Sequence, residues 1–196
     1  MVSVRVNGSD APIPGTPSSS FGDLIELIKS GIDPEHMITS ILLDGRELED
    51  ADWTKNLGQF GTSIIEIDTD TPERFVTARM ACAGDVVKSI FLQFRDARQG
   101  FQNGGMFDGN QKLLRAVNTA KAFFEWYATM MELVPEGQKA KYDINDQVQV
   151  ISDICKRVCQ QQLYQSWWAL GETLEKELEP KLDKLESFCS KFATAA

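Results

Sequence analysis

Long runs of apolar residues at helical spacing constrain this chain more than any other feature. Across residues 76–101, and again across 113–134, an apolar side chain recurs in alternating steps of four and three. This period places one apolar stripe along a helix, whereas a half-buried strand needs strict alternation. The pattern predicts two helices, each about 40 Å long at 1.5 Å per residue, within an all-α bundle of residues 72–196.

A third apolar stripe runs from residue 144 to residue 189. Unbroken, a helix of about 50 residues would measure about 75 Å, which is too long beside the first two. Breaks are expected at Gln160–Gln162, at Gly171 or at Pro180. A turn at the glutamines gives four helices in up-down order, whereas a kink at Pro180 alone leaves three helices and a tail. We favour the four-helix arrangement.

The first third of the chain is predicted to be a small domain with both strands and a helix, so the fold class is α+β. Short apolar runs alternate with polar residues, and Asn-Gly and Asp-Gly turn signals separate them. One stretch has helical spacing instead, with Ser19 or Ser20 as its cap. The expected elements are strands at Val2–Val6 and Ala11–Ile13, a helix at Phe21–Ile28, and strands at Ile38–Leu43, Arg46–Leu48 and Ser63–Ile67.

The helix and its exit, Leu24–Ile38, are followed by the turn-containing run Leu42–Asp50 and by a segment through Trp53, Leu57 and Phe60 to the last strand. In this order of elements, residues 1–71 resemble a ubiquitin-like β-grasp domain. Conjugated members of that family need a flexible diglycine tail, but here Asp68–Thr71 leads straight into a helix. The resemblance therefore implies a domain that presents a surface to a protein partner.

The boundary between the two predicted domains, 1–71 and 72–196, lies at Asp68–Pro72. Thr71 is suited to cap a helix, Pro72 to occupy its first position, and Glu73 to interact with its positive end. The linker between the domains is therefore expected to be very short.

Negative charge is concentrated in the N-terminal third. The chain carries 29 acidic and 20 basic residues, a formal net charge of −9. Residues 1–72 hold 13 of the acids and 4 of the bases, so the remainder is neutral. Nucleic acid is not an expected partner, because its phosphates need a basic surface. We expect the acidic domain to attract a basic protein through four residues near the Asp-Gly turn: Glu47, Glu49, Asp50 and Asp52.

The helical domain also carries apolar residues beyond its main stripes. Phe123, Trp126 and Met130 widen the second stripe and predict a groove for an amphipathic partner helix. Trp167 continues the third stripe, whereas Trp168 points about 100° away and is expected to contact another domain or a partner. The order of helices across 85–192 is similar to that of bacterial flagellar export chaperones, which implies that such a groove holds a partner. No residue role follows from that similarity.

Catalytic and metal-binding patterns are not found. His36 is the only histidine and is predicted to lie on a surface turn, so no histidine-based catalytic triad is expected. Cys155 and Cys159 share a helix face, but two thiols do not complete a zinc site, and all four cysteines are expected to be reduced. No nucleotide-binding glycine motif occurs. No metal, cofactor or catalytic residue is therefore predicted.

These features predict a cytoplasmic, non-enzymatic protein that binds another protein as an adaptor or secretion-type chaperone. Membrane insertion is not expected, because no apolar run of 18 or more residues occurs. The oligomeric state is left open. The alternative is an enzyme or ligand-binding bundle in which carboxylates such as Glu125 and Glu132 act as acid and base.

Overall fold

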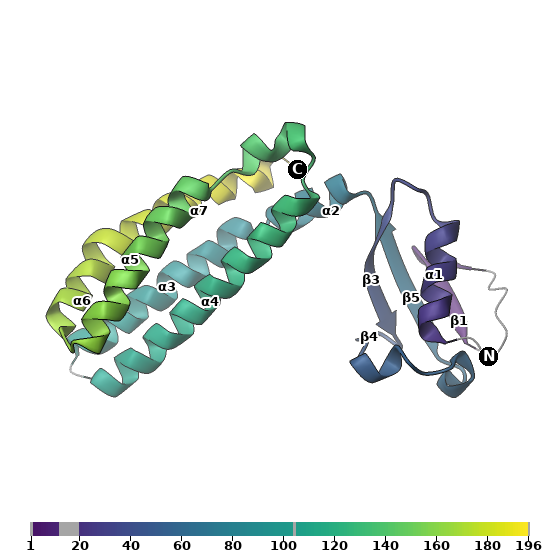
Figure 1. Cartoon of the computed structure of the whole chain (residues 1–196), viewed down its shortest axis with the longest axis horizontal. Coiled ribbons are helices and arrows are strands. Elements are labelled where there is room, and N and C mark those ends of the chain that lie inside the picture. The colour runs from purple at the N-terminus through teal and green to yellow at the C-terminus, as the bar shows by residue number, and fades with distance from the viewer. Residues whose placement is uncertain (1, 12–19, 104, 196) are drawn as a thin grey trace. The chain divides into compact units, whose positions relative to one another are not determined.

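The computed structural model describes residues 2–11, 20–103 and 105–195. The chain divides into two compact units, residues 1–75 and 76–196. The first contains a mixed sheet and the second is helical (Figure 1). The α+β class predicted from the sequence is confirmed.

The sheet of the first unit has five strands in the order β2-β1-β5-β3-β4. The strands are β1 (Ser3–Val6), β2 (Ser9–Asp10), β3 (Met37–Leu43), β4 (Arg46–Glu47) and β5 (Ile64–Asp70). Strand β1 pairs in parallel with β5, and the other neighbours are antiparallel. Both tight turns use positive φ angles at two successive residues, Asn7-Gly8 and Asp44-Gly45, which suits the right-handed twist of the strands they join.

Two strands differ from the prediction by more than one residue. The second strand is Ser9–Asp10 rather than Ala11–Ile13, of which residues 12 and 13 lie outside the described residues. Strand β5 continues beyond Ile67 to Asp70, because Thr69 and Asp70 pair with Ile38 and Met37 of β3. Sheet pairing thus extends the strand through residues whose composition is typical of a loop.

Helix α1 (Phe21–Gly31) packs on one face of the sheet. Its N-terminus is closed by a reciprocal capping box, in which the Asp23 amide donates to Ser20 Oγ (3.1 Å) and the Ser20 amide donates to Asp23 Oδ2 (2.9 Å). Of the two predicted caps, Ser19 and Ser20, the structure has Ser20. The buried core between helix and sheet consists of Val4, Phe21, Leu24, Ile25, Leu43, Leu57, Phe60, Ile65 and Ile67.

A helix begins where predicted after the sheet, but it is short. The Arg74 amide donates to Thr71 Oγ1 (3.3 Å) at the start of α2 (Pro72–Met80). Residues 81 and 82 form a turn, and α3 (Ala83–Gln102) follows. The predicted single helix through 76–101 is therefore wrong. The apolar stripe in the sequence gives no sign of this break, because buried residues lie directly before the turn, at Met80, and directly after it, at Ala83.

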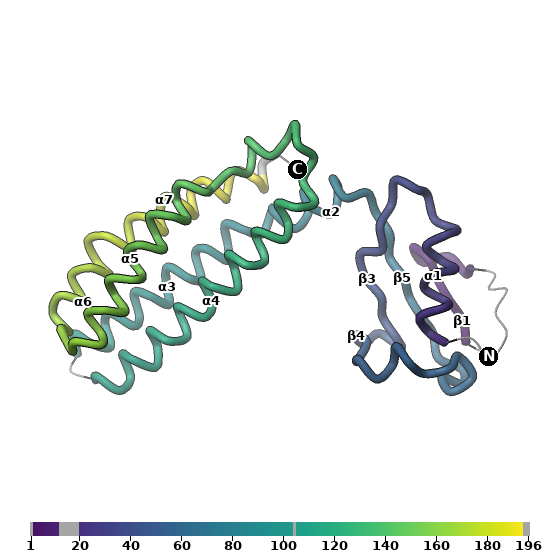
Figure 2. Tube along the Cα trace, in the orientation of Figure 1, coloured from purple at the N-terminus to yellow at the C-terminus, as the bar shows by residue number. Residues whose placement is uncertain are grey.

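The remaining helices of the second unit are α4 (Met106–Leu133), α5 (Asn145–Leu163), α6 (Trp167–Thr173), the π-helical turn Leu174–Leu178 and α7 (Glu179–Cys189). Helix α3 packs against α4 and α7, and α5 packs against α6, the π-helical turn and α7. The long segments run alternately up and down (Figures 1 and 2). A 3-10 segment, Glu136–Tyr142, connects α4 to α5.

The third stripe breaks just after the glutamine run, so the four-helix arrangement is confirmed. Gln165 has a φ of 53°, and the Ser166 amide donates to the Gln161 carbonyl (2.8 Å), which closes a tight turn before α6. The helix does not end at Pro180. A wider π-helical turn precedes this proline, in which the Glu179 amide donates to the Leu174 carbonyl. This turn accommodates a residue that has no amide hydrogen of its own.

A side chain at Gly109 is expected to destabilise the helical unit. An added Cβ atom would lie 2.7 Å from the ring of Phe101, which is buried and stacked on Trp167. Overpacking lowers the free energy of unfolding by about 1–3 kcal/mol. This loss exceeds the gain of up to about 1 kcal/mol that comes from replacing a glycine within a helix by alanine. Urea unfolding of Gly109→Ala should therefore show a lower free energy of unfolding than the wild type.

Gly171→Ala is the matched control, because an added Cβ atom at Gly171 meets nothing within 4 Å. This substitution in α6 should raise the free energy of unfolding by up to about 1 kcal/mol. Equal effects of the two substitutions would contradict the close packing at Gly109.

Candidate functional site

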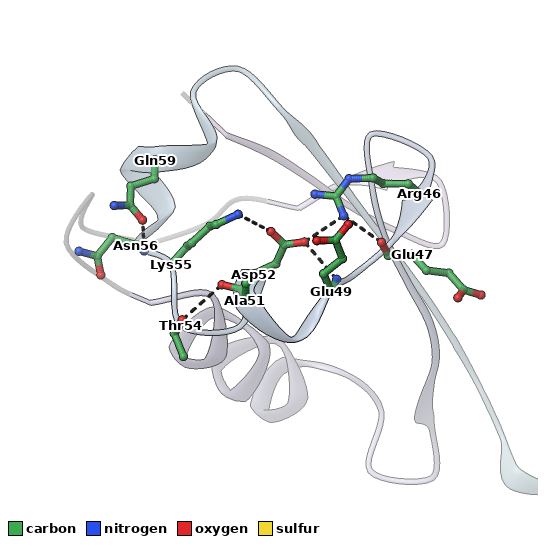
Figure 3. A network of polar contacts seen from close by, with 9 residues as sticks. All are labelled: Arg46, Glu47, Glu49, Ala51, Asp52, Thr54, Lys55, Asn56 and Gln59. Atoms are coloured by element: carbon green, nitrogen blue, oxygen red, sulfur yellow. Dashed lines mark hydrogen bonds and ion pairs between the residues drawn. The ribbon is translucent and has the colours of Figure 1, made fainter.

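The predicted acidic cluster contains a closed network around Asp52 (Figure 3). The carboxylate of Asp52 is buried and accepts hydrogen bonds from Lys55 Nζ (2.7 Å), Arg46 Nη1 (2.9 Å) and the Glu49 amide (3.1 Å). Arg46 comes from β4, and Asp52 ends the 3-10 turn Asp50–Asp52. The network therefore fixes this turn against the end of the sheet.

The hydrogen bonds from Lys55 and Arg46, together with the Glu49 amide, hold the pKa of Asp52 well below its usual range. Its negative charge is compensated by two cations within the fold, and its side chain is not accessible to a partner. Asp52 is thus a structural residue, and its burial does not favour the predicted contact with a partner. Charge counting along the sequence could not distinguish a paired, buried carboxylate from an exposed one.

The sheet face opposite α1 carries acidic side chains beside apolar ones. Ile65 and Ile67 of β5 belong to the core under α1, so alternation places Ile64, Glu66 and Asp68 on the other face. In the neighbouring strand, Leu42 pairs with Glu66 on one side and with Glu47 on the other. We call Leu42, Glu47, Ile64, Glu66 and Asp68 the acidic sheet face.

Glu47 and Asp68 of this face are exposed, and Glu66 is half-buried. Arg5 of β1 lies in register with Glu66, but its guanidinium pairs with Asp10 (3.2 Å). Of the four acids predicted to meet a partner, Glu47 is therefore on the acidic sheet face. Glu49 and Asp50 are exposed in the loop that follows β4.

Sequence reasoning missed Glu66 and Asp68 because they were assigned to the last strand and the linker by their local pattern alone. The alternation of buried Ile65 and Ile67 along β5 was the available signal. Only the order of strands, which sets β4, β3 and β5 side by side, brings these acids near Glu47.

The predicted groove of the helical domain is filled by the chain itself. Phe123 and Met130 are buried, and Trp126 is half-buried with its ring 5.8 Å from that of Phe123. Burial of Phe123 and Met130 does not favour the predicted partner groove at these residues. In several turns of α4, the buried residue is the one before the residue predicted to be buried. Ala116, Phe123 and Met130 are buried, whereas Val117, Phe124 and Met131 were predicted.

Apolar side chains are instead exposed where α4 begins, α5 ends and α6 begins. Trp168 is 80% exposed and Phe107 is 78% exposed, and Leu163 and Tyr164 are both 77% exposed. Trp168 was predicted to point away from the seam, and it does. Leu163 was predicted to continue the seam, which is wrong because the helix turns at the next residues. Phe107 was missed, since it precedes the predicted start of its helix.

The groups considered for chemistry are dispersed. Glu125 and Glu132 are exposed on α4, and Glu125 pairs with Lys121 (3.7 Å). His36 Nδ1 lies 3.4 Å from Thr69 Oγ1. Within residues 2–11, 20–103 and 105–195, no group of three or more histidine, cysteine, aspartate or glutamate side chains is arranged to hold a metal ion.

The four cysteines are free thiols. Burial raises the pKa of Cys155 to about 11 and that of Cys189 to about 12. Both groups are therefore held as neutral thiols, which are poor nucleophiles. Among the helices of the described part of the chain, none has the length and apolar content of a membrane span.

The contribution of Asp52 to stability is expected to depend on pH. Because the fold holds its pKa below the unfolded value of about 3.9, ionisation of Asp52 stabilises the folded state. That stabilisation is fully present above the unfolded pKa and is lost as the pH falls through the folded pKa. Asp52→Asn should therefore have a lower urea midpoint than the wild type at about pH 7, and the difference should narrow below about pH 4.

The exposed neighbour Asp50 provides the control for the change in formal charge. Asp50→Asn should leave the urea midpoint at neutral pH close to that of the wild type. A difference between Asp52→Asn and the wild type that stayed constant from pH 7 to about pH 3 would contradict the role of the ionised carboxylate.

Comparisons with protein-family models, with curated proteins and with solved structures found no match to this chain.

Proposed function

We propose that this protein is a non-enzymatic adaptor, in which a ubiquitin-like β-grasp domain presents the acidic sheet face to a basic surface of another protein. The arrangement of the first unit supports the β-grasp assignment. A mixed sheet in the order β2-β1-β5-β3-β4 packs around one face of α1, which lies between β2 and β3 in the chain.

The observation that carries the proposal is the row Glu47-Leu42-Glu66 across three neighbouring strands. Cross-strand neighbours have Cβ atoms about 4.5–5.5 Å apart, so two carboxylates flank one apolar side chain. Such a row suits a basic surface with an apolar centre, because carboxylates steer the encounter and burial of the leucine supplies affinity. Asp68 and the net negative charge of residues 1–72 strengthen the negative electrostatic potential at this surface.

The chain path supports a presenting role rather than a conjugating one. Strand β5 ends at Asp70, and only Thr71 separates it from α2. The last strand of the sheet therefore continues into a helix, where a conjugated modifier needs a flexible tail with a free carboxylate. A groove-binding chaperone is not proposed, because Phe123 and Met130 are buried.

Neutralising the acidic row should slow the capture of a partner. In Glu47→Gln/Glu66→Gln, two charges are removed while side-chain size is kept, so the association rate should fall by about 3- to 10-fold. The association of this variant should also depend less steeply on salt. Proteins retained by the immobilised full chain from lysate would first be identified, and their association rates then measured by surface plasmon resonance at about 50 and 300 mM salt.

Glu26→Gln/Glu35→Gln is the matched control, because it removes two exposed charges of the same unit from α1 and the turn that follows it. Partner association should be unchanged in this control. A partner that binds both double variants with the same rate and the same salt dependence would show that the acidic sheet face is not its binding site.

A further inference from the structure

We propose that the exposed apolar end of the helical bundle is the contact through which two copies of this chain form a dimer. The surface consists of Phe107 and Leu114 of α4, Leu163 and Tyr164 at the end of α5, and Trp168 of α6. We call it the bundle end. It belongs to the helical unit, and the inference does not depend on the acidic sheet face.

The residues of the bundle end come from segments that meet in space. Phe107, Asn110 and Leu114 are spaced by three and four, so they lie along one side of α4. Asn110 Oδ1 accepts a hydrogen bond from Gln162 Nε2 (2.8 Å), which places this side of α4 beside the end of α5. Leu163 and Tyr164 follow Gln162 directly, and the three helix ends lie together in Figure 2.

The scaffold that carries this surface is tightly packed. Phe101 of α3 stacks on Trp167 with ring centroids 5.5 Å apart. An added Cβ atom at Gly100 would lie 3.0 Å from Gly109 Cα, so the backbones of α3 and α4 approach closely there. A surface held in this way is ordered before it binds, which lowers the entropic cost of association.

The exposed area is large enough for a dimer contact. Phe107, Tyr164 and Trp168 are 77–80% exposed. Aromatic side chains bury about 150–250 Å² each, so these three offer roughly 350–600 Å² per copy. Two copies would bury roughly twice that area before Leu114 and Leu163 are counted, which approaches the ~1,200–2,000 Å² of stable interfaces. Apolar patches of this extent are often functional.

Charge favours a second copy as the occupant. Lys112 near the bundle end is already paired with Asp96 (3.1 Å) and Asp108 (2.9 Å). The neighbouring polar side chains include the neutral Asn110 and Gln162, and residues 73–196 carry no net charge. Because this part of the chain is neutral as a whole, two identical copies can meet about a two-fold axis without net charge repulsion.

The test is sedimentation velocity of the full chain at about 1–100 µM. The wild type should shift from monomer to dimer over this range, and about 0.5 M NaCl should leave the dimer intact because apolar burial drives it. Trp168→Ala should weaken the dimer by at least about 30-fold, as expected for a central aromatic anchor. Tyr164→Ser is the second variant and should weaken it as well.

Leu92→Ala is the matched control, because Leu92 is a half-exposed apolar residue of α3 outside the bundle end. It should dimerise as the wild type does, and far-UV circular dichroism should show the same helix content in all variants. A wild type that is monomeric at 100 µM, a dimer that 0.5 M NaCl dissociates, or a dimer that Leu92→Ala weakens as much as Trp168→Ala would each overturn the proposal.

Discussion

The helical unit depends on the burial of α3 between α4 and α7. Val87, Ile90, Phe94 and Ala97 of α3 are almost fully buried, so this helix has neighbours along its whole length. Small residues allow the close approach that this burial requires. At Gly84, for example, an added Cβ atom would lie 3.0 Å from the backbone of Ser190. Helix α5 then packs against α6 and α7, which completes the four-helix bundle.

Most helices could be predicted from apolar periodicity, but the phase of the seam could not. Along α4, two sets of apolar residues satisfy steps of four and three, one through Val117 and Phe124 and one through Ala116 and Phe123. The structure buries the second set, which includes the small residues Ala116 and Ala120, and α4 packs against α3. Which set is buried depends on the partner helix, and single-sequence periodicity contains no information about that partner.

The candidate surfaces were predictable only in part, for a related reason. Glu47 and Trp168 stand out in sequence by charge and by position on a helix, and both are exposed. Asp52 resembles its acidic neighbours in sequence. In the structure, however, its carboxylate is buried and accepts hydrogen bonds from Arg46 and Lys55, which hold the loop in place. Glu66 lies near Glu47 only because of the order of strands in the sheet. Phe107 lies near Trp168 only because the ends of α4, α5 and α6 meet. Contacts made by the folded chain therefore determine which charged and aromatic side chains remain exposed to a partner.

The π-helical turn at Leu174–Leu178 sets the rotational phase of everything that follows it. Leu170, Leu174 and Leu178 are all buried at intervals of four, although a regular α-helix drifts by about 40° over each such interval. The wider turn absorbs that drift and brings Leu182 to the same buried side. The wider turn holds one residue more than a regular turn, so loss of one residue here would restore a regular α-helix and keep Leu182 on the buried side, whereas the same loss elsewhere in the helix would rotate the remainder by about 100°.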